Sequence, residues 1–175
     1  MIPSLVRDLI ENPTREVLDV LYAAETQVPF LWIDWREDDA GIAATCDAIV
    51  GPCVFAAEWR GDDRFVRGRG REVQVLFEQD AGDRHRALVA CNESLAPTHE
   101  IRFVWETDGA DTGELLLLSA DDWESLESDH GHEAVGAAYL ALAPHPNLFT
   151  DPLHALLPKR PAPPSLGSHA WWRFR

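Results

Sequence analysis

The spacing of apolar residues divides the chain into helices and strands. Apolar side chains three or four residues apart predict helices, and short alternating or continuous apolar runs bounded by Gly, Pro or Asp predict strands. By these criteria the predicted helices cover residues 5–11, 13–26, 40–50, 83–95, 120–130 and 133–143, and the predicted strands cover residues 30–35, 53–59, 72–78, 100–105 and 114–119. The pattern predicts an α/β (α+β) fold with a single mixed sheet of about five strands flanked by helices.

The clearest local prediction is a β-hairpin followed by a capped helix. Residues 100–105 and 114–119 are strand-like, and the intervening TDGADTG is rich in turn residues. Ser119 then precedes a helix with Asp122 where a capping box usually has Glu, and Gly131 is expected just past the end of that helix. These signals predict both ends of the helix.

The composition changes at Pro144. Seven of the twelve prolines lie in residues 144–175, where RPAPPSLGS is typical of an extended linker and precedes the terminal AWWRFR. The sequence therefore predicts a single domain over residues 1–143 and a proline-rich tail over residues 144–175.

Charge is distributed unevenly along the chain. The 175 residues carry 15 Lys and Arg against 30 Asp and Glu, a formal net charge of −15. Two segments run against this trend: residues 60–71 hold five arginines and two acids, and residues 159–175 hold four basic residues and no acid. An acidic body repels phosphate backbones, which disfavours nucleic-acid binding, and it attracts a basic protein partner and speeds the encounter.

The sequence indicates neither a membrane nor an oxidising compartment. No run of about 18 apolar residues is present, and Arg7 and Glu11 come too early for a secretory signal. Cys46, Cys53 and Cys91 are an odd number in apolar settings without a C-x-x-C pair, which favours free buried thiols over zinc ligands. We expect a cytoplasmic protein.

Three segments carry a family resemblance. WIDWRED, then NESLAPTHEIRFVW, then DTGELLLLSADDWESLE resemble an uncharacterised family of bacterial proteins of unknown function. The resemblance covers residues 30–131 and leaves the proline-rich tail outside. It implies a single α/β domain and no particular activity, so no catalytic residue follows from it.

The densest group of metal-ligand side chains is Asp129-His130-Gly131-His132-Glu133. Two imidazoles and two carboxylates can hold a divalent cation, and an open coordination position makes such a site hydrolytic. The same residues suit a solvated helix end, because histidine in a last helical turn interacts favourably with the helix dipole. A metal site at His130, His132 and Glu133 and a plain helix end stay alternatives, and a divalent metal is the one cofactor that the sequence suggests.

Four acids, Asp34, Glu37, Asp38 and Asp39, lie at or just after the end of the first predicted strand, where open α/β sheets often bind ligands. Paired carboxylates at such a place can act as acid and base or bind magnesium. Asp34 stands inside an apolar run, and burial raises the pKa of a carboxyl group unless a cation or donor compensates. Pairing of Asp34 with an arginine such as Arg102, and capping of the next helix by Asp38 or Asp39, explain the same residues structurally.

The segment RFVRGRGR also has two interpretations. Guanidinium groups, Arg67 and Arg69 among them, suit a phosphate or carboxylate, although no phosphate-binding loop motif is present. A mobile hairpin connection whose arginines offset the acidic body is the structural alternative.

The tryptophans separate into two groups. The tryptophans on predicted strands are expected in the core; they are Trp32, Trp35, Trp59 and Trp105. Trp123 is expected to be half-buried against the sheet. By contrast, Trp171, Trp172, Arg173 and Phe174 follow the linker and are of the residue types enriched in binding hot spots. This tail either docks on its own domain or on a second copy, or it captures another protein.

These observations favour a non-catalytic protein-binding module, in its narrower form an immunity- or antitoxin-like acidic inhibitor of a basic partner. The alternative is a metal-dependent hydrolase that uses Asp129, His130, His132 and Glu133. A third hypothesis is a small-anion site within residues 60–71.

Overall fold

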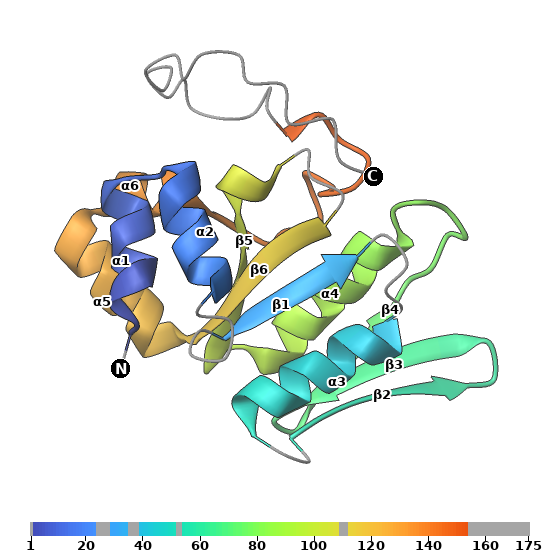
Figure 1. The fold of residues 1–175 in the computed structure, drawn as a ribbon. Helices are drawn as coiled ribbons and strands as arrows, with labels where there is room; N and C mark the ends of the chain where they lie inside the picture. Colours follow the sequence, from blue (N-terminus) through green and yellow to red (C-terminus); the bar gives the residue numbers. More distant parts are fainter. Residues whose placement is uncertain (1, 24–28, 35–38, 52–53, 109–111, 154–175) are drawn as a thin grey trace.

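The computed structural model describes residues 2–23, 29–34, 39–51, 54–108 and 112–153. These residues form six α-helices, one 3₁₀-helix and seven strands (Figure 1). The helices are α1 (Ser4–Glu11), α2 (Arg15–Ala23), α3 (Asp39–Val50), α4 (Asp83–Leu95), η1 (Trp105–Thr107), α5 (Ala120–His130) and α6 (His132–Ala138). The strands are β1 (Phe30–Asp34), β2 (Phe55–Arg60), β3 (Asp63–Gly68), β4 (Arg71–Val75), β5 (His99–Val104), β6 (Thr112–Ser119) and β7 (Tyr139–Ala141).

The strands form two antiparallel sheets. Sheet A has the order β1-β6-β5-β7, and sheet B has the order β2-β3-β4. Helices α3 and α4 pack between the two sheets, whereas α1, α2, α5 and α6 cover the other face of sheet A (Figure 1). The mixed α and β class is confirmed. The prediction of one mixed sheet is wrong, because pairing between strands distant in sequence leaves no local pattern.

Sheet A is buried on both faces. In β6, Leu115 and Leu117 face the core beneath α3 and α4, whereas Leu116 and Leu118 face the helices on the other side. A run of four leucines suits a strand between two helical layers. The predicted hairpin is confirmed as β5 and β6. β1 was predicted as an interior strand and is an edge strand, but it lies between the same two layers and is therefore apolar on both faces.

The arginine- and glycine-rich segment contains the central strand of sheet B. β3 pairs with β2 on one side and with β4 on the other, so the predicted mobile connection is wrong. Val66 is fully buried, and a Cβ on Gly68 would lie 3.0 Å from a ring carbon of Phe55. Arg69 and Gly70 both have positive φ, at 46° and 83°, which closes a tight two-residue hairpin turn. Packing and turn geometry, not strand propensity, therefore determine this strand.

Both predicted ends of α5 are confirmed. The Ser119 Oγ accepts a hydrogen bond from the Asp122 backbone N–H at 3.1 Å, and the helix ends at Gly131 with φ 87°. Trp123, predicted to be half-buried, is 1% exposed and donates its indole N–H to the Glu100 carbonyl at 2.9 Å. Trp123 and Leu126 are the buried residues that hold this helix on sheet A.

Arg102 ties α5 to β5. Its guanidinium donates to both carboxylate oxygens of Glu100 at 2.9 Å and to Glu127 at 2.7 Å, and it lies over the Trp123 ring at 4.3 Å from the centroid. The hydrogen bond from Arg102 lowers the pKa of the Glu127 carboxyl below its ordinary value. The side chain of Asp34, the predicted partner of Arg102, lies outside the described part of the chain.

The chain after α6 returns to the sheet. The predicted helix over residues 133–143 ends at Ala138, because Tyr139–Ala141 pairs with β5 as strand β7. Leu148 and Phe149 pack against the core between the sheets, and Leu153 is buried. The first part of the predicted tail therefore lies against the body.

No described helix is both long enough and apolar enough to cross a bilayer. Cys46 and Cys91 are buried and free, as predicted, and Cys53 lies outside the described residues.

Candidate functional site

The most unusual exposed surface lies at the end of sheet B. Among the described residues three large hydrophobic side chains are exposed: Trp59 at 55%, Leu76 at 68% and Val20 at 50%. Trp59 and the half-buried Phe77 contact each other with ring centroids 5.6 Å apart. We call Trp59, Phe77 and the sequence neighbour Leu76 the aromatic ridge, although Leu76 lines a different hollow from the two aromatic rings. Exposed aromatic surface of this kind on a folded domain marks interaction sites more often than single scattered apolar residues do.

Strand ends position the ridge. Trp59 is next to last in β2, where the strand runs beyond the helices that cover its earlier residues. The guanidinium of Arg64, a buried residue of β3, lies 5.3 Å from the Trp59 ring centroid and supports it from one side. Just after β4, the Phe77 N–H donates to the Val75 carbonyl at 3.2 Å, which turns the chain and directs Phe77 toward Trp59.

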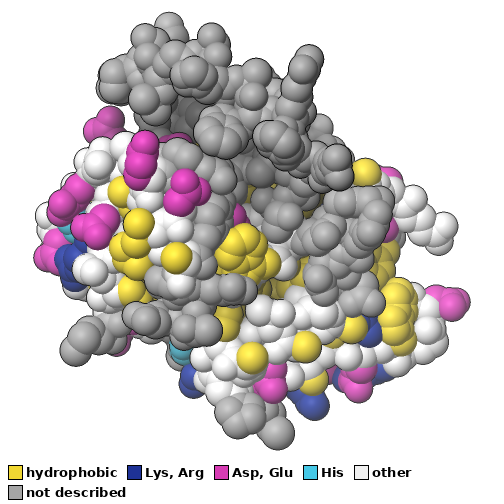
Figure 2. Space-filling view, viewed as in Figure 1, with side chains coloured by type: hydrophobic (Ala, Val, Ile, Leu, Met, Phe, Trp, Pro, Cys, Tyr) yellow, Lys and Arg dark blue, Asp and Glu magenta, His cyan; other side chains and the backbone are white. Residues whose placement is uncertain are grey.

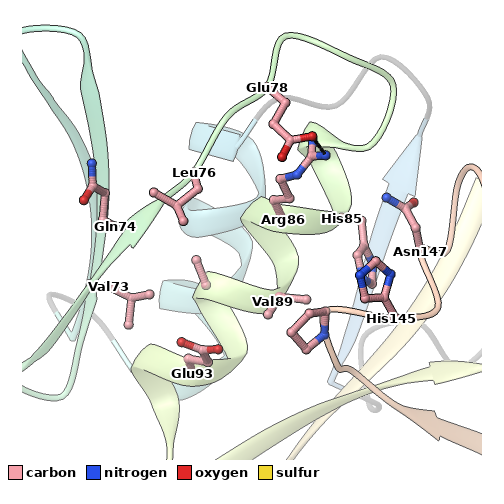
Figure 3. A pocket seen from close by; sticks show the side chains of 12 residues that line it. Val73, Gln74, Leu76, Glu78, His85, Arg86, Val89, Glu93, His145 and Asn147 are labelled. Atoms are coloured by element: carbon pink, nitrogen blue, oxygen red, sulfur yellow. Dashed lines mark hydrogen bonds and ion pairs between the residues drawn. The ribbon is translucent and has the colours of Figure 1, made fainter.

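A hollow lies on either side of the ridge. One has a volume of about 430 Å³ and runs between β4, α4 and residues 144–147 (Figure 3). The other has a volume of about 540 Å³ and is lined by Trp59, Gly61, Asp62, Phe77, Gln79 and Asp83. The ridge therefore separates two concave surfaces, and both are open to a partner.

The surroundings of the ridge are acidic. Arg86 binds Glu78, Asp80 and Asp83 at 2.5–2.6 Å, so three carboxylates share one cation. The hydrogen bond from this guanidinium lowers the pKa of the Asp80 carboxyl below its ordinary value. Asp62 and Glu93 have no ion-pair partner among the described residues. We call these five carboxylates the acidic rim. On the face seen in Figure 2, acidic side chains gather over α1 and α2, whereas acidic and basic side chains are mixed over sheet B.

His85 forms one wall of the hollow between β4 and α4. Its Nε2 lies 2.8 Å from the Ala143 carbonyl oxygen, and its Nδ1 accepts from the Leu148 N–H at 3.4 Å. A carbonyl only accepts and an N–H only donates, so the ring is neutral with its proton on Nε2. Burial is the main cause that lowers the pKa of His85, which agrees with this neutral form. His85 therefore holds the segment of residues 143–148 against α4.

The histidines of the candidate metal site point to different partners. His130 Nδ1 lies 3.7 Å from Glu11 of α1, whereas His132 Nδ1 lies 3.3 Å from Glu127 of α5. Asp129 binds Arg7 at 2.5 Å, and Glu133 is exposed. Among the described residues no three His, Cys, Asp or Glu side chains come together as a metal-binding group.

The other predicted site residues are dispersed. Arg67 is exposed on the outer face of sheet B opposite Glu72, and Arg69 is exposed in the β3–β4 turn. Trp171, Trp172, Arg173 and Phe174 lie outside the described residues, as does Asp38.

The ridge was not among the predicted site residues. Trp59 was expected in the core because it lies on a predicted strand, and this is wrong: the strand continues past its helical cover. The prediction holds for Trp105, which is 6% exposed. The turn residues Arg60-Gly61-Asp62 follow Trp59 directly and mark the end of its strand, where burial ceases. This turn is the sequence signal that could have indicated an exposed Trp59.

Comparisons of the chain with protein-family models, with curated protein sequences and with solved structures found no match. The family resemblance stays a prediction, and the function has to be argued from the geometry.

Proposed function

We propose that this protein is a non-catalytic module that binds a basic protein partner through the aromatic ridge and the acidic rim. The observation that carries the proposal is that Trp59, which is 55% exposed and in contact with Phe77, lines a hollow together with the carboxylates Asp62 and Asp83. Tryptophan at the centre of an interface supplies much of the binding energy, and a surrounding acidic field steers a basic partner.

The acidic charge of the protein best fits a narrower form of this function: the protein inhibits a basic enzyme, as an immunity protein or antitoxin does. Carboxylates on the rim can take the positions that phosphates occupy in an enzyme with a basic active site. The net charge of −15 supports the same choice, because it favours fast association with a cationic surface.

The test is affinity capture from the source lysate with the full-length protein. A double variant, Trp59→Ala with Leu76→Ala, removes the exposed part of the ridge, and Val20→Ala removes an equally exposed apolar side chain from α2. The wild type and Val20→Ala are expected to retain a stoichiometric basic protein at low salt, and the double variant is expected to lose it.

Two further capture experiments test the roles of charge and of the C-terminal tail. High salt should release the partner, because the rim acts through screened charges. A chain ending at Pro158 tests whether Trp171, Trp172, Arg173 and Phe174 add a second contact or bind a second copy. An empty capture by folded wild type, or equal retention by the double variant, would overturn the proposal.

A further inference from the structure

Sheet B ends in a strand with open hydrogen-bonding groups. β4 is the last strand of the sheet and pairs with β3 through Gly68↔Arg71 and Val66↔Val73. In an antiparallel pair closed by a two-residue turn, the residues that flank the turn are hydrogen-bonded, and the bonding alternates from there. Arg71 and Val73 therefore bond to β3. The backbone N–H and C=O of the alternate residues, Glu72 and Gln74, point away from it.

At the opposite edge of sheet B, the first residue of β2 is capped by a side chain of α3. By the same alternation the Phe55 N–H of β2 points away from β3, and it donates to the Asp47 carboxylate of α3 at 2.8 Å. Asp47 also accepts from the Val54 N–H at 2.8 Å. No such acceptor from a neighbouring helix is recorded for the outward groups of Glu72 and Gln74 within the described structure. The start of the β2 edge is therefore capped by α3, whereas the outward groups of Glu72 and Gln74 on β4 have no such cap among the described residues.

The hollow between β4 and α4 lies along this open edge. Its lining includes Val73 from the inner face of β4 and Gln74 and Leu76 from the outer face (Figure 3). Only a hollow beside the strand edge can touch side chains of both faces, because successive residues of a strand point to opposite sides. Across from the strand, Val89 and Ala90 of α4 supply an apolar wall.

Carboxylates flank the apolar part of the hollow. Figure 3 shows Glu93 and Glu78 toward opposite ends of the hollow, with Val89 of α4 between them and Glu78 next to Arg86. Glu78 is bound by Arg86, but Glu93 has no ion-pair partner among the described residues. An occupant with a small apolar side chain in the middle and a cationic one near Glu93 complements this lining.

We propose that an extended, basic segment of the protein partner binds in this hollow as an additional strand of sheet B. Its backbone pairs with the outward groups of Glu72 and Gln74, an apolar side chain contacts Val89 and Ala90, and a lysine or arginine pairs with Glu93. The inference rests on the proposed function and specifies the binding mode, in which main-chain hydrogen bonds supply affinity and side-chain pockets supply specificity.

The test uses short capped peptides of alternating lysine and valine as the probe. Matched probes replace lysine by glutamate, or carry N-methyl groups that remove the backbone donors without changing the side chains. On the protein, Gln74→Pro removes the outward N–H, whereas Gln74→Ala removes the side chain and its bond to Asp63 but keeps that N–H. Binding is measured by calorimetry on the full-length chain.

The basic peptide is expected to bind, and Gln74→Pro is expected to weaken it about tenfold while Gln74→Ala changes it about twofold or less. Amide hydrogen exchange of Glu72 and Gln74 in the wild type should slow with the basic peptide and not with the N-methylated one. This readout does not depend on the proline variant folding. Absence of binding, equal binding to folded Gln74→Pro, or unchanged exchange would overturn the strand-addition mode.

The two proposals fail differently. If a captured partner is lost with the Trp59 and Leu76 double variant but retained by Gln74→Pro, the ridge binds it and strand addition is wrong. If the double variant retains the partner, the proposed function itself is wrong.

Discussion

Replacing Arg102 by methionine should destabilise the protein strongly at neutral pH. The substitution keeps most of the apolar stem and removes a guanidinium that makes two hydrogen bonds to Glu100 and one to Glu127 and stacks on Trp123. Glu100 and Glu127 then lose the guanidinium that they share, and Glu127 keeps only the contact with His132 at 3.3 Å. Removing one partner of a buried ion pair costs about 3–5 kcal/mol. The side chains of Glu100 and Glu127 are 30% and 26% exposed and regain water, so the lower end applies.

We therefore expect the free energy of unfolding to fall by about 3 kcal/mol at pH 7, measured by urea denaturation. Arg86→Met is the matched control, because Arg86 binds three carboxylates where Arg102 binds two, but its side chain is more exposed, at 26% against 10% for Arg102. Its loss should be clearly smaller, since exposed ion pairs are screened by water and salt.

At acid pH, the difference in the free energy of unfolding between the wild type and Arg102→Met should become smaller. Arg102 lowers the pKa of Glu127 in the folded protein below its ordinary value of 4.5. The unfolded chain therefore binds more protons in this range. The stabilisation is complete above pH 4.5 and is lost as the pH falls through the folded pKa. A loss below about 1 kcal/mol at pH 7, a loss equal to that of Arg86→Met, or a difference independent of pH would refute the reasoning.

Three further outcomes follow from local geometry. Ser119→Ala should lower the free energy of unfolding by about 1 kcal/mol through loss of the α5 cap, and an unchanged thermal midpoint would contradict this. Gly68→Ala should lower the free energy of unfolding, because the new Cβ would lie 2.9 Å from the Ser94 Oγ, whereas the Cβ of Gly136→Ala in α6 meets no atom within 4 Å and should raise it by about 0.5 kcal/mol. If chemical denaturation gave the opposite order of stability, the packing argument would be wrong. Burial lowers the pKa of His85 below its ordinary 6.5, so its neutral form stabilises the fold above that pH and stability should decline below it; an NMR titration giving a raised pKa would exclude this role.

Elements determined by local chemistry were predictable from the sequence. The hairpin of β5 and β6, helix α4 and both ends of α5 each follow from a short pattern, such as Ser119 before Asp122 or Gly131 after the last helical residue. In these segments the hydrophobic period, the turn residues and the caps all indicate the same structure.

Elements determined by distant packing were not predictable. β3 has a loop-like composition, and it is a strand because Val66 is buried under α4 and because Gly68 leaves room for the Phe55 ring. The aromatic ridge was missed for the related reason that burial of Trp59 depends on where α3 and α4 end relative to β2, which no local pattern records.

The most direct test of the central claim is the affinity of the purified, captured partner for the wild type and for Trp59→Ala, measured by calorimetry at low salt. If the ridge is the centre of the interface, truncation of Trp59 should weaken binding by about 2 kcal/mol or more, roughly thirtyfold. Val20→Ala should leave the affinity unchanged. Affinities of the wild type and Trp59→Ala within about twofold of each other would contradict the claim that this surface binds the partner.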